Sequence, residues 1–355
     1  MPLRAIVNNE DVLAPFLDDE AWQLLKTRVK NEHLDVRLPC CGNVAYLRTS
    51  KHGVKHFVHK ECDTCTSAPE TWQHLKAKHE IVLACKAAEY DAITEVPGDG
   101  WRADVLAVKG KVKIAFEIQW SPQTWEETQE RQQKYKEAGI RGCWLFKRPP
   151  VQYRANDEVP LFKFEITEDA ATVIFNPYSY EYESHDRRIN LSEFVTALLH
   201  GKIKFCDHLT SLPRQTVRMV FVETRCWKCF KPFHVYYVKD LVTSCGDELE
   251  ANCFDPQFVK IAISLRSDER YSHIETGDIK ERSSKTAGEK YISFGCPQCD
   301  AIVGNFFLFH EIFLGAHYSE DKAPAIWEKE ITLRHLVSSP DAHWCFPEGG
   351  QFCGK

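Results

Sequence analysis

The sequence predicts an α/β fold: a mixed sheet with flanking helices, accompanied by two smaller modules rich in cysteine. Three observations predict it. Patterns typical of a helix, three strands, a helix and a strand follow one another between residues 70 and 146. Two Cys-x-x-Cys motifs stand in the C-terminal part of the chain, at 226–229 and 296–299. A looser set of cysteine and histidine residues stands near its start. A chain of 355 residues is long enough for two or three domains.

The first helix of this succession is predicted over residues 70–90. Trp72, Leu75, His79 and Val82 recur there at steps of three and four residues, which places them on one helical face. We expect this face to pack on the sheet.

The strands that follow are predicted to form a hairpin around Lys109-Gly110-Lys111-Val112, because glycine at the first turn position is typical of a type II′ turn. This turn fixes the register and places Asp104 opposite Glu117 and Arg102 opposite Gln119. The alternate positions of the two strands, from Ala103 to Ala107 and from Ile114 to Ile118, are all apolar. We therefore expect one face of the hairpin to be core and the opposite face to gather acids.

A second tight turn at Asp99-Gly100 would pair Glu95 with Asp104, although Pro97 cannot donate to that ladder. Neighbouring carboxylates repel one another unless a positive charge lies between them. Mg²⁺ or Mn²⁺ is the natural candidate, because both are hard ions that prefer oxygen ligands. The alternative is a solvated sheet face whose acids point into water.

The second helix is predicted to begin with Ser121 as its N-cap and Pro122 at its first position, and to end before Gly139. Residues 141–146 have the composition of a buried strand. The helix can then join strand 113–119 to this strand as a right-handed parallel crossover.

The C-terminal part of the chain carries the clearest metal motif. Two Cys-x-x-Cys turns lie between apolar runs and supply Cys226, Cys229, Cys296 and Cys299. Four thiolates at this spacing suit tetrahedral zinc and predict a zinc ribbon, although about 66 residues separate the turns. A closed four-cysteine site leaves no open position for chemistry, so its role would be folding. The alternative is four thiols without metal. The polar segment 267–290 inside the insertion is predicted to be a flexible loop.

The N-terminal motif is less regular. We favour a zinc site made of Cys41, His59, Cys62 and Cys65, with Cys40 and His56 as alternates. The alternative is that a histidine of the His-Phe-Val-His run packs in the core or contacts a phosphate.

Charge and composition bound the function. The net charge is −6, yet residues 26–60 hold eight Lys and Arg against two Asp and Glu. Such a basic stretch fits a nucleic-acid backbone, with a solvated face as the alternative. No segment approaches the roughly 20 apolar residues that span a bilayer, and no signal peptide opens the chain. The 15 cysteines then indicate a reducing cytoplasm and metal-bound thiolates.

Residues 36 to about 205 resemble the CoiA-like competence proteins, whose nuclease core is similar to the PD-(D/E)xK superfamily. The resemblance rests on the order of several short motifs: His-Phe-Val-His at 56–59, His74 with Lys78, Glu95, Arg-Ala-Asp-Val at 102–105, Glu-Ile-Gln at 117–119, Arg131 with Tyr135, and the segment 191–205. It implies a restriction-endonuclease-like core in which Asp104 and Glu117 bind metal and Glu95 is a third candidate ligand.

Gln119 then occupies the place of the superfamily's lysine. Lysine can activate water or stabilise negative charge, whereas a glutamine amide can only orient water or donate a hydrogen bond. The missing charge could come from Lys78 or Arg131, and Arg131 shares a helix face with Tyr135. The alternatives are a solvated Lys78, a surface Arg131 and a partly buried Tyr135.

The sequence therefore predicts three domains: an N-terminal zinc module (1–66), a nuclease-like domain (67–205) and a zinc-ribbon domain (206–355). The expected function is metal-dependent cleavage of DNA, including single-stranded DNA, in the handling of incoming or foreign DNA. The main alternative is a zinc-stabilised adaptor that binds nucleic acid through a silent nuclease fold. Protein partners and homo-oligomerisation are left open.

Overall fold

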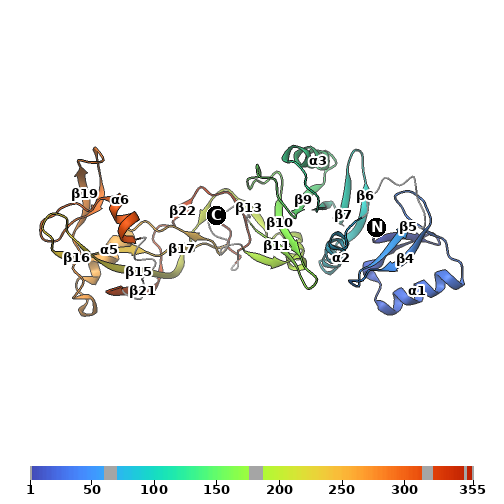
Figure 1. The fold of residues 1–355 in the computed structure, drawn as a ribbon, viewed down its shortest axis with the longest axis horizontal. Coiled ribbons are helices and arrows are strands. Elements are labelled where there is room, and N and C mark those ends of the chain that lie inside the picture. The colour runs from blue at the N-terminus through green and yellow to red at the C-terminus, as the bar shows by residue number, and fades with distance from the viewer. Residues whose placement is uncertain (1, 60–69, 176–186, 314–322, 348–349, 354–355) are drawn as a thin grey trace. The chain divides into compact units, whose positions relative to one another are not determined.

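The structure is a computed structural model that describes residues 2–59, 70–175, 187–313, 323–347 and 350–353. The chain forms two compact units. The first contains residues 1–207 and 342–352, and the second contains residues 208–341 and 353–355. Figure 1 labels their elements. No helix among the described residues is both long and apolar enough to cross a membrane.

The first unit is built on a seven-stranded mixed sheet with the order β12-β11-β10-β9-β8-β7-β6. Its strands are β6 (Asp91–Pro97), β7 (Arg102–Lys109), β8 (Val112–Gln119), β9 (Arg141–Phe146), β10 (Leu161–Ile166), β11 (Ala171–Ile174) and β12 (Arg188–Asn190). Strand β9 runs parallel to β8 and β10, and the other neighbouring pairs are antiparallel. The predicted mixed α/β fold and the parallel crossover are confirmed.

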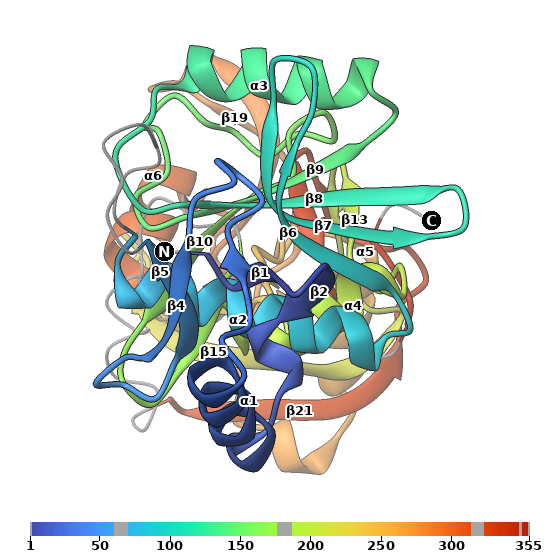
Figure 2. The same cartoon turned by 90° about the vertical axis from the view of Figure 1, so that its right-hand side faces the viewer.

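Helices cover both faces of this sheet. Helices α2 (Trp72–Ala87) and α4 (Leu191–Leu199) pack on one face in a cluster with Phe116 and Phe162. Helix α3 (Trp125–Glu137) packs on the other face, where Tyr135 meets Trp144. Figure 2 shows α3 and α2 on opposite sides of the sheet. The predicted acid-lined face is therefore wrong, because strands in a sheet covered on both faces bury apolar residues on both sides.

The helix boundaries follow from capping. Helix α2 starts after Thr71, whose hydroxyl accepts the His74 amide at 3.3 Å. Helix α3 starts after Thr124 rather than after the predicted Ser121 cap. Thr124 and Glu127 form a capping box that satisfies two orphan amides at once, whereas the Ser-Pro pair satisfies fewer. Gly139, at a φ of 68°, ends the helix as predicted.

The N-terminal part of the first unit has a hydrophobic cluster of its own around Trp22 and Phe57. Helix α1 (Asp19–Asn31) follows the short 3₁₀ turn η1 (Ala14–Phe16). The strands are β1 (Arg4–Val7), β2 (Glu10–Leu13), β3 (Val36–Arg37), β4 (Ala45–Thr49) and β5 (Lys55–His59). They form a three-stranded sheet, β2-β1-β3, and a β4–β5 hairpin. Strand β13 (Lys204–Cys206) pairs with β23 (His343–Cys345) in the same unit.

The second unit is centred on β15, which pairs with β16 on one side and β21 on the other. Its longer elements are β15 (Arg214–Arg225), β16 (Pro232–Val238), α5 (Pro256–Leu265), β19 (Ile279–Ser284), β20 (Glu289–Phe294), α6 (Asn305–Phe307), the π-helix η4 (Leu308–Phe313) and β21 (Ala325–Thr332). Its shorter elements are β14 (Leu209–Thr210), β17 (Leu241–Val242), β18 (Glu248–Leu249), η3 (Glu269–Tyr271) and β22 (Ser338–Ser339).

The charged insertion is not simply a flexible loop, contrary to the prediction. Strands β19 and β20 form a hairpin within and just beyond it. Arg282 explains this order, because its guanidinium is buried and donates to the Ser293 carbonyl at 2.6 Å and to the Asp300 carboxylate at 2.5 Å. A buried, paired cation fixes the hairpin in place.

Candidate active site

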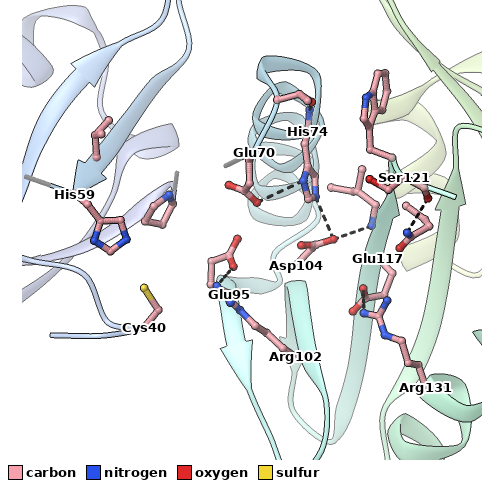
Figure 3. A pocket seen from close by; sticks show the side chains of 16 residues that line it. Cys40, His59, Glu70, His74, Glu95, Arg102, Asp104, Glu117, Ser121 and Arg131 are labelled. Atoms are coloured by element: carbon pink, nitrogen blue, oxygen red, sulfur yellow. Dashed lines mark hydrogen bonds and ion pairs between the residues drawn. The ribbon is translucent and has the colours of Figure 1, made fainter. Parts of the chain in front are cut away.

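A cavity of about 640 Å³ opens in the first unit where β7 begins and β8 ends, beside the start of α2. Its walls contain most of the residues that the sequence singled out: Glu95, Asp104, Glu117, Gln119 and Arg131. Other side chains complete it: Cys40, His59, Glu70, His74, Arg102 and Ser121. Figure 3 shows His74 projecting from the start of α2 toward Asp104, and Glu70, just before the helix, contacting the other side of the His74 ring, with Cys40 and His59 across the cavity.

The β7–β8 hairpin opens at Asp104. The predicted register is confirmed from Lys109–Val112 to Val105–Phe116. The two pairings predicted beyond that point are not formed by these described strands. The Asp104 carboxylate accepts the Ile118 amide at 2.9 Å and takes the place of a ladder bond. The strands part there, which makes room for the acidic side chains.

Asp104 is held in its ionised form. Burial alone would raise its pKa, but His74, Lys78 and the Ile118 amide together hold the pKa below the usual value. His74 Nε2 lies 3.2 Å from Asp104 Oδ2. At neutral pH the carboxylate therefore carries a charge that a cation could neutralise.

The pKa of Glu117 is displaced in the opposite direction to that of Asp104. Its side chain is 3% exposed and contacts the Arg131 guanidinium and the Tyr135 hydroxyl. Burial raises the pKa of Glu117 to about 8, with the Asp104 charge adding to the effect and Arg131 and Tyr135 opposing it. Two nearby carboxylates thus have pKa values displaced in opposite directions, which is a feature of functional sites.

Glu95 lies within the β6–β7 pairing, between Thr94–Val105 and Val96–Ala103, which places it across from Asp104 as predicted. Its backbone has a φ of 57°, an unusual value for a side-chain-bearing residue inside a strand.

Two cations meet the Glu95 carboxylate. The Lys78 ammonium contacts it, and so does the Arg102 guanidinium. Lys78 also binds Glu70 at 2.6 Å. Lys78 is fully buried rather than solvated, so the alternative of a solvent-exposed helix residue is wrong.

Gln119 and Arg131 lie at the far side of the cavity. The Gln119 amide donates to the Ser121 carbonyl at 2.8 Å. Arg131 donates to Gln123 at 3.0 Å and stacks over Trp144, with 4.9 Å between its guanidinium carbon and the ring centroid. The side chain of Arg131 is nevertheless 31% exposed, so part of its charge is accessible from the cavity.

Glu70 and His74 form a donor set that the sequence did not predict. Glu70, His74 and Asp104 each offer a ligand atom within 4.8 Å of the others. The signal was present as a Glu-x-x-x-His spacing at the start of the predicted helix, where four residues bring two side chains to one face. Carboxylate and imidazole donors suit Mn²⁺ and related ions. Asp104 is therefore shared between this set and the predicted pair with Glu117.

The four cysteines of the second unit come together. Cys226 Sγ lies 3.5 Å from Cys299 Sγ, and Cys229 Sγ lies 3.6 Å from Cys296 Sγ. Tetrahedral zinc with its usual Zn–S bonds requires sulfur atoms about 3.8 Å apart, so this set fits the ion. The two turns share a backbone pattern. In each, the backbone amide of the first cysteine, Cys226 or Cys296, donates to the carbonyl of the residue five positions later. The carbonyl of the same cysteine accepts the amide of the residue four positions later.

The same backbone pattern recurs near the start of the chain. The Leu38 amide donates to Asn43 at 3.1 Å, and the Leu38 carbonyl accepts the Gly42 amide at 2.8 Å. Leu38 therefore occupies the place of the first cysteine in a zinc-binding turn, and Cys41 occupies the place of the second.

The predicted N-terminal zinc set is partly assembled. Cys41 Sγ lies 3.8 Å from both Cys40 Sγ and His59 Nδ1, and the three offer ligand atoms within 4.8 Å of one another. Cys40, an alternate in the prediction, thus joins Cys41 and His59. His56 does not, because its ring is buried and its Nδ1 lies 3.0 Å from the Val54 carbonyl. Cys62 and Cys65 lie outside the described residues.

A helix-flanked mixed sheet, with carboxylates where two strands part, is the architecture of a nuclease-like domain. Residues 70–221 match the family model described as competence protein CoiA, nuclease-like domain. Over this segment the chain is similar to that domain family. No curated protein matches the chain.

Proposed function

We propose that the first unit is a divalent-metal-dependent nuclease that cleaves DNA phosphodiester bonds. The observation that carries this proposal is the opposite displacement of two pKa values in one cavity. Asp104 is held ionised while Glu117 beside it binds a proton near neutrality. A cavity used only to bind phosphate would gain nothing from carboxylates, which repel the DNA backbone.

The charge balance of the cavity supports a bound cation. Among the described residues, the carboxylates of Glu70, Glu95, Asp104 and Glu117 face the side chains of Lys78, Arg102, Arg131 and His74. Glu117 takes up a proton, because a second buried negative charge is costly. A divalent ion at this place would remove that cost. When bound, Mg²⁺ or Mn²⁺ would supply positive charge and Lewis-acid chemistry.

The chain's own residues can be given distinct roles. Asp104 and Glu117 would hold the ion, with Glu95, Glu70 and His74 as further ligands. Lys78 is fully buried, so it would position Glu95 and Glu70 rather than touch substrate.

Arg131 and Gln119 are the two side chains that would contact the substrate. Arg131 is partly exposed and would contact a phosphate oxygen while its other bonds keep it in place. Tyr135 would orient Glu117. The Gln119 amide would exchange its bond to Ser121 for one to water or phosphate.

DNA is the proposed substrate because the matching family is described as a competence protein, and because the basic stretch 26–60 belongs to the same unit. The proposed setting is the cytoplasmic handling of incoming or foreign DNA. The second candidate is an adaptor that binds nucleic acid without cleaving it. Gln119 at the place of the superfamily's lysine favours that candidate, since a neutral amide cannot stabilise charge as lysine does.

We also propose that the cysteine sets hold structural zinc, one ion on Cys226, Cys229, Cys296 and Cys299, and a second on the N-terminal set. The sulfur spacing and the repeated backbone turns support this role. A site with four thiolate ligands has no open position, so it would contribute folding energy rather than catalysis.

One assay separates nuclease from adaptor. The pure full-length protein is incubated with plasmid, linear duplex and single-stranded DNA, with Mg²⁺, with Mn²⁺ or with neither. The nuclease proposal expects cleavage only when one of these ions is added, and loss of cleavage in Glu117→Gln. Glu130→Gln, which changes an exposed acid of α3, is the matched control. Binding of DNA without cleavage under any of these conditions would support the adaptor instead.

A further inference from the structure

The second unit contains a groove of about 650 Å³ beside the first cysteine turn. The β19–β20 hairpin and the segment that leads into α6 form its other walls. Aromatic rings line it from three segments: Trp227, Tyr291, Phe306 and Phe307. None of these residues belongs to the nuclease-like cavity of the first unit.

The rings of this groove are unusually exposed. Trp227 is 67% exposed, Phe306 is 74% exposed and Phe307 is 49% exposed. Phe230 and Phe309 are exposed on the same two segments but do not line the groove, so these two segments carry five of the seven exposed aromatic residues in the described chain. Exposed apolar surface concentrated in this way marks a binding site.

The orientation of Trp227 is fixed although its ring is exposed. The indole N–H donates to the Ile302 carbonyl at 2.9 Å, which ties the ring to the opposite wall of the groove. A ring held in place before binding loses little conformational entropy when a ligand packs on it. The Trp227 ring is thus preorganised for stacking against a planar group.

Positive charge exceeds negative charge on two segments that form the groove, and of their charged residues Arg225 and Glu289 line it. Residues 225–231 contain Arg225, Lys228 and Lys231 and no acid, and residues 284–291 contain Lys285 and Lys290 against Glu289. All six charged residues are exposed. This excess of cations is notable in a chain whose net charge is −6. Lysine is depleted from protein–protein interfaces, whereas aromatic rings combined with basic side chains are typical of surfaces that bind single-stranded nucleic acid.

We propose that this groove binds unpaired nucleotides of single-stranded DNA. Bases stack on Trp227, Phe306 and Phe307, and the neighbouring phosphates contact Arg225, Lys228 and Lys231. The choice of DNA rests on the proposed nuclease function, while the stacking surface itself does not. The groove would let the protein retain a single strand independently of the cavity that cuts it.

The test is equilibrium binding of a labelled oligo-deoxythymidine of about 20 nucleotides. Full-length protein is used without added Mg²⁺ or Mn²⁺ and without chelator, so that DNA is not cut and thiolate-bound zinc is retained. The double variant Trp227→Ala/Phe306→Ala should bind roughly 10- to 100-fold more weakly. Ile263→Ala, which removes an exposed apolar side chain from α5 of the same unit, should bind as the wild type does.

Two further variants show whether bases and phosphates both contribute. Trp227→Phe keeps a ring and should retain most of the affinity that Trp227→Ala loses. Native far-ultraviolet circular dichroism and an unchanged zinc content of the alanine variant would exclude a folding defect as the cause of its lost affinity. Lys228→Glu should weaken binding and lower the slope of log Kd against log salt by about 0.7. Competition with unlabelled duplex or with a single-stranded RNA of the same length tests the choice of ligand, and single-stranded DNA should compete best.

The outcomes are distinct. Unchanged binding by the double variant overturns the proposal, as does equal competition by duplex DNA. A change of oligomeric state in the double variant, with DNA binding intact, would assign the groove to self-association instead. Failure of the nuclease proposal looks different, because DNA would remain uncut with Mg²⁺ and Mn²⁺ while the groove variants still lost affinity for the single strand.

Discussion

Glu117→Gln should stabilise the ion-free protein as the pH rises. The unfolded carboxyl titrates near its usual pKa of 4.5, whereas burial raises the folded pKa to about 8. Between these values the folded state holds the proton more tightly, so the stability that it contributes is present below pH 4.5 and is lost as the pH rises through 8. From pH 5 to pH 7 the wild type should lose about 2 kcal/mol through this group. Glutamine does not titrate, so the variant loses no stability through this position as the pH rises.

Thermal melting across pH 5 to 8 measures this difference. A relative change of about 2 kcal/mol corresponds to a shift of roughly 4–8 °C in Tm for a unit of this size. Glu130→Gln removes an exposed acid of α3, the helix that carries Arg131 and Tyr135, and should follow the wild type at every pH. Added Mn²⁺ should restore the wild type at pH 7 and have a smaller effect on the glutamine variant. Parallel melting curves for wild type and Glu117→Gln would refute the raised pKa and the charge argument built on it.

Three further predictions follow from the site and the cysteine sets. Asp104→Ala should abolish ion-dependent DNA cleavage because it removes the carboxylate shared by both donor sets. Its far-ultraviolet circular dichroism should remain native, and wild-type cleavage rates would show that the site is assigned wrongly. Gln119→Ala should slow cleavage on the order of tens to hundreds of fold by loss of a positioned water, whereas Gln119→Lys should remain active, and single-turnover rates decide between them. Cys229→Ser should lower Tm and remove about one zinc per chain in elemental analysis, while Asp104→Ala should remove none.

Local turn chemistry made the centre of the first unit predictable. Gly110 adopts a φ of 59°, a value that glycine reaches without steric cost, and one turn then sets the register of β7 and β8 from Lys109–Val112 to Val105–Phe116. The turn at Asp99 and Gly100 acts in the same way for β6 and β7, where the Gly98 amide donates to the Trp101 carbonyl at 2.8 Å. Because side chains alternate along strands, two correct turns are enough to bring three acids together.

Tertiary contacts decided what the sequence did not predict. The Asp104 carboxylate interrupts the ladder at Ile118, and no local pattern shows that a side chain will replace a backbone partner there. Lys78 looks like an ordinary helix residue, yet its ammonium lies among Glu70 and Glu95 because α2 packs directly over the ends of the strands. Cys40 was an alternate because the expected Cys-x-x-Cys spacing fails at Leu38. The backbone nevertheless forms the zinc-binding turn, and the neighbouring thiol lies beside Cys41.

The neutral residue at position 119 and the raised pKa of Glu117 have one physical explanation. Gln119 lines the same cavity as Glu117, so a lysine there would add a positive charge near both acids and favour their ionised forms. In this chain the fixed cations are Lys78, Arg102 and Arg131, and each is already engaged by a carboxylate. Burial, together with the Asp104 charge, outweighs the effect of Arg131 on Glu117, which is why Glu117 keeps a proton near neutrality. A site of this kind should depend more strongly on a bound divalent ion than one that carries lysine at this position.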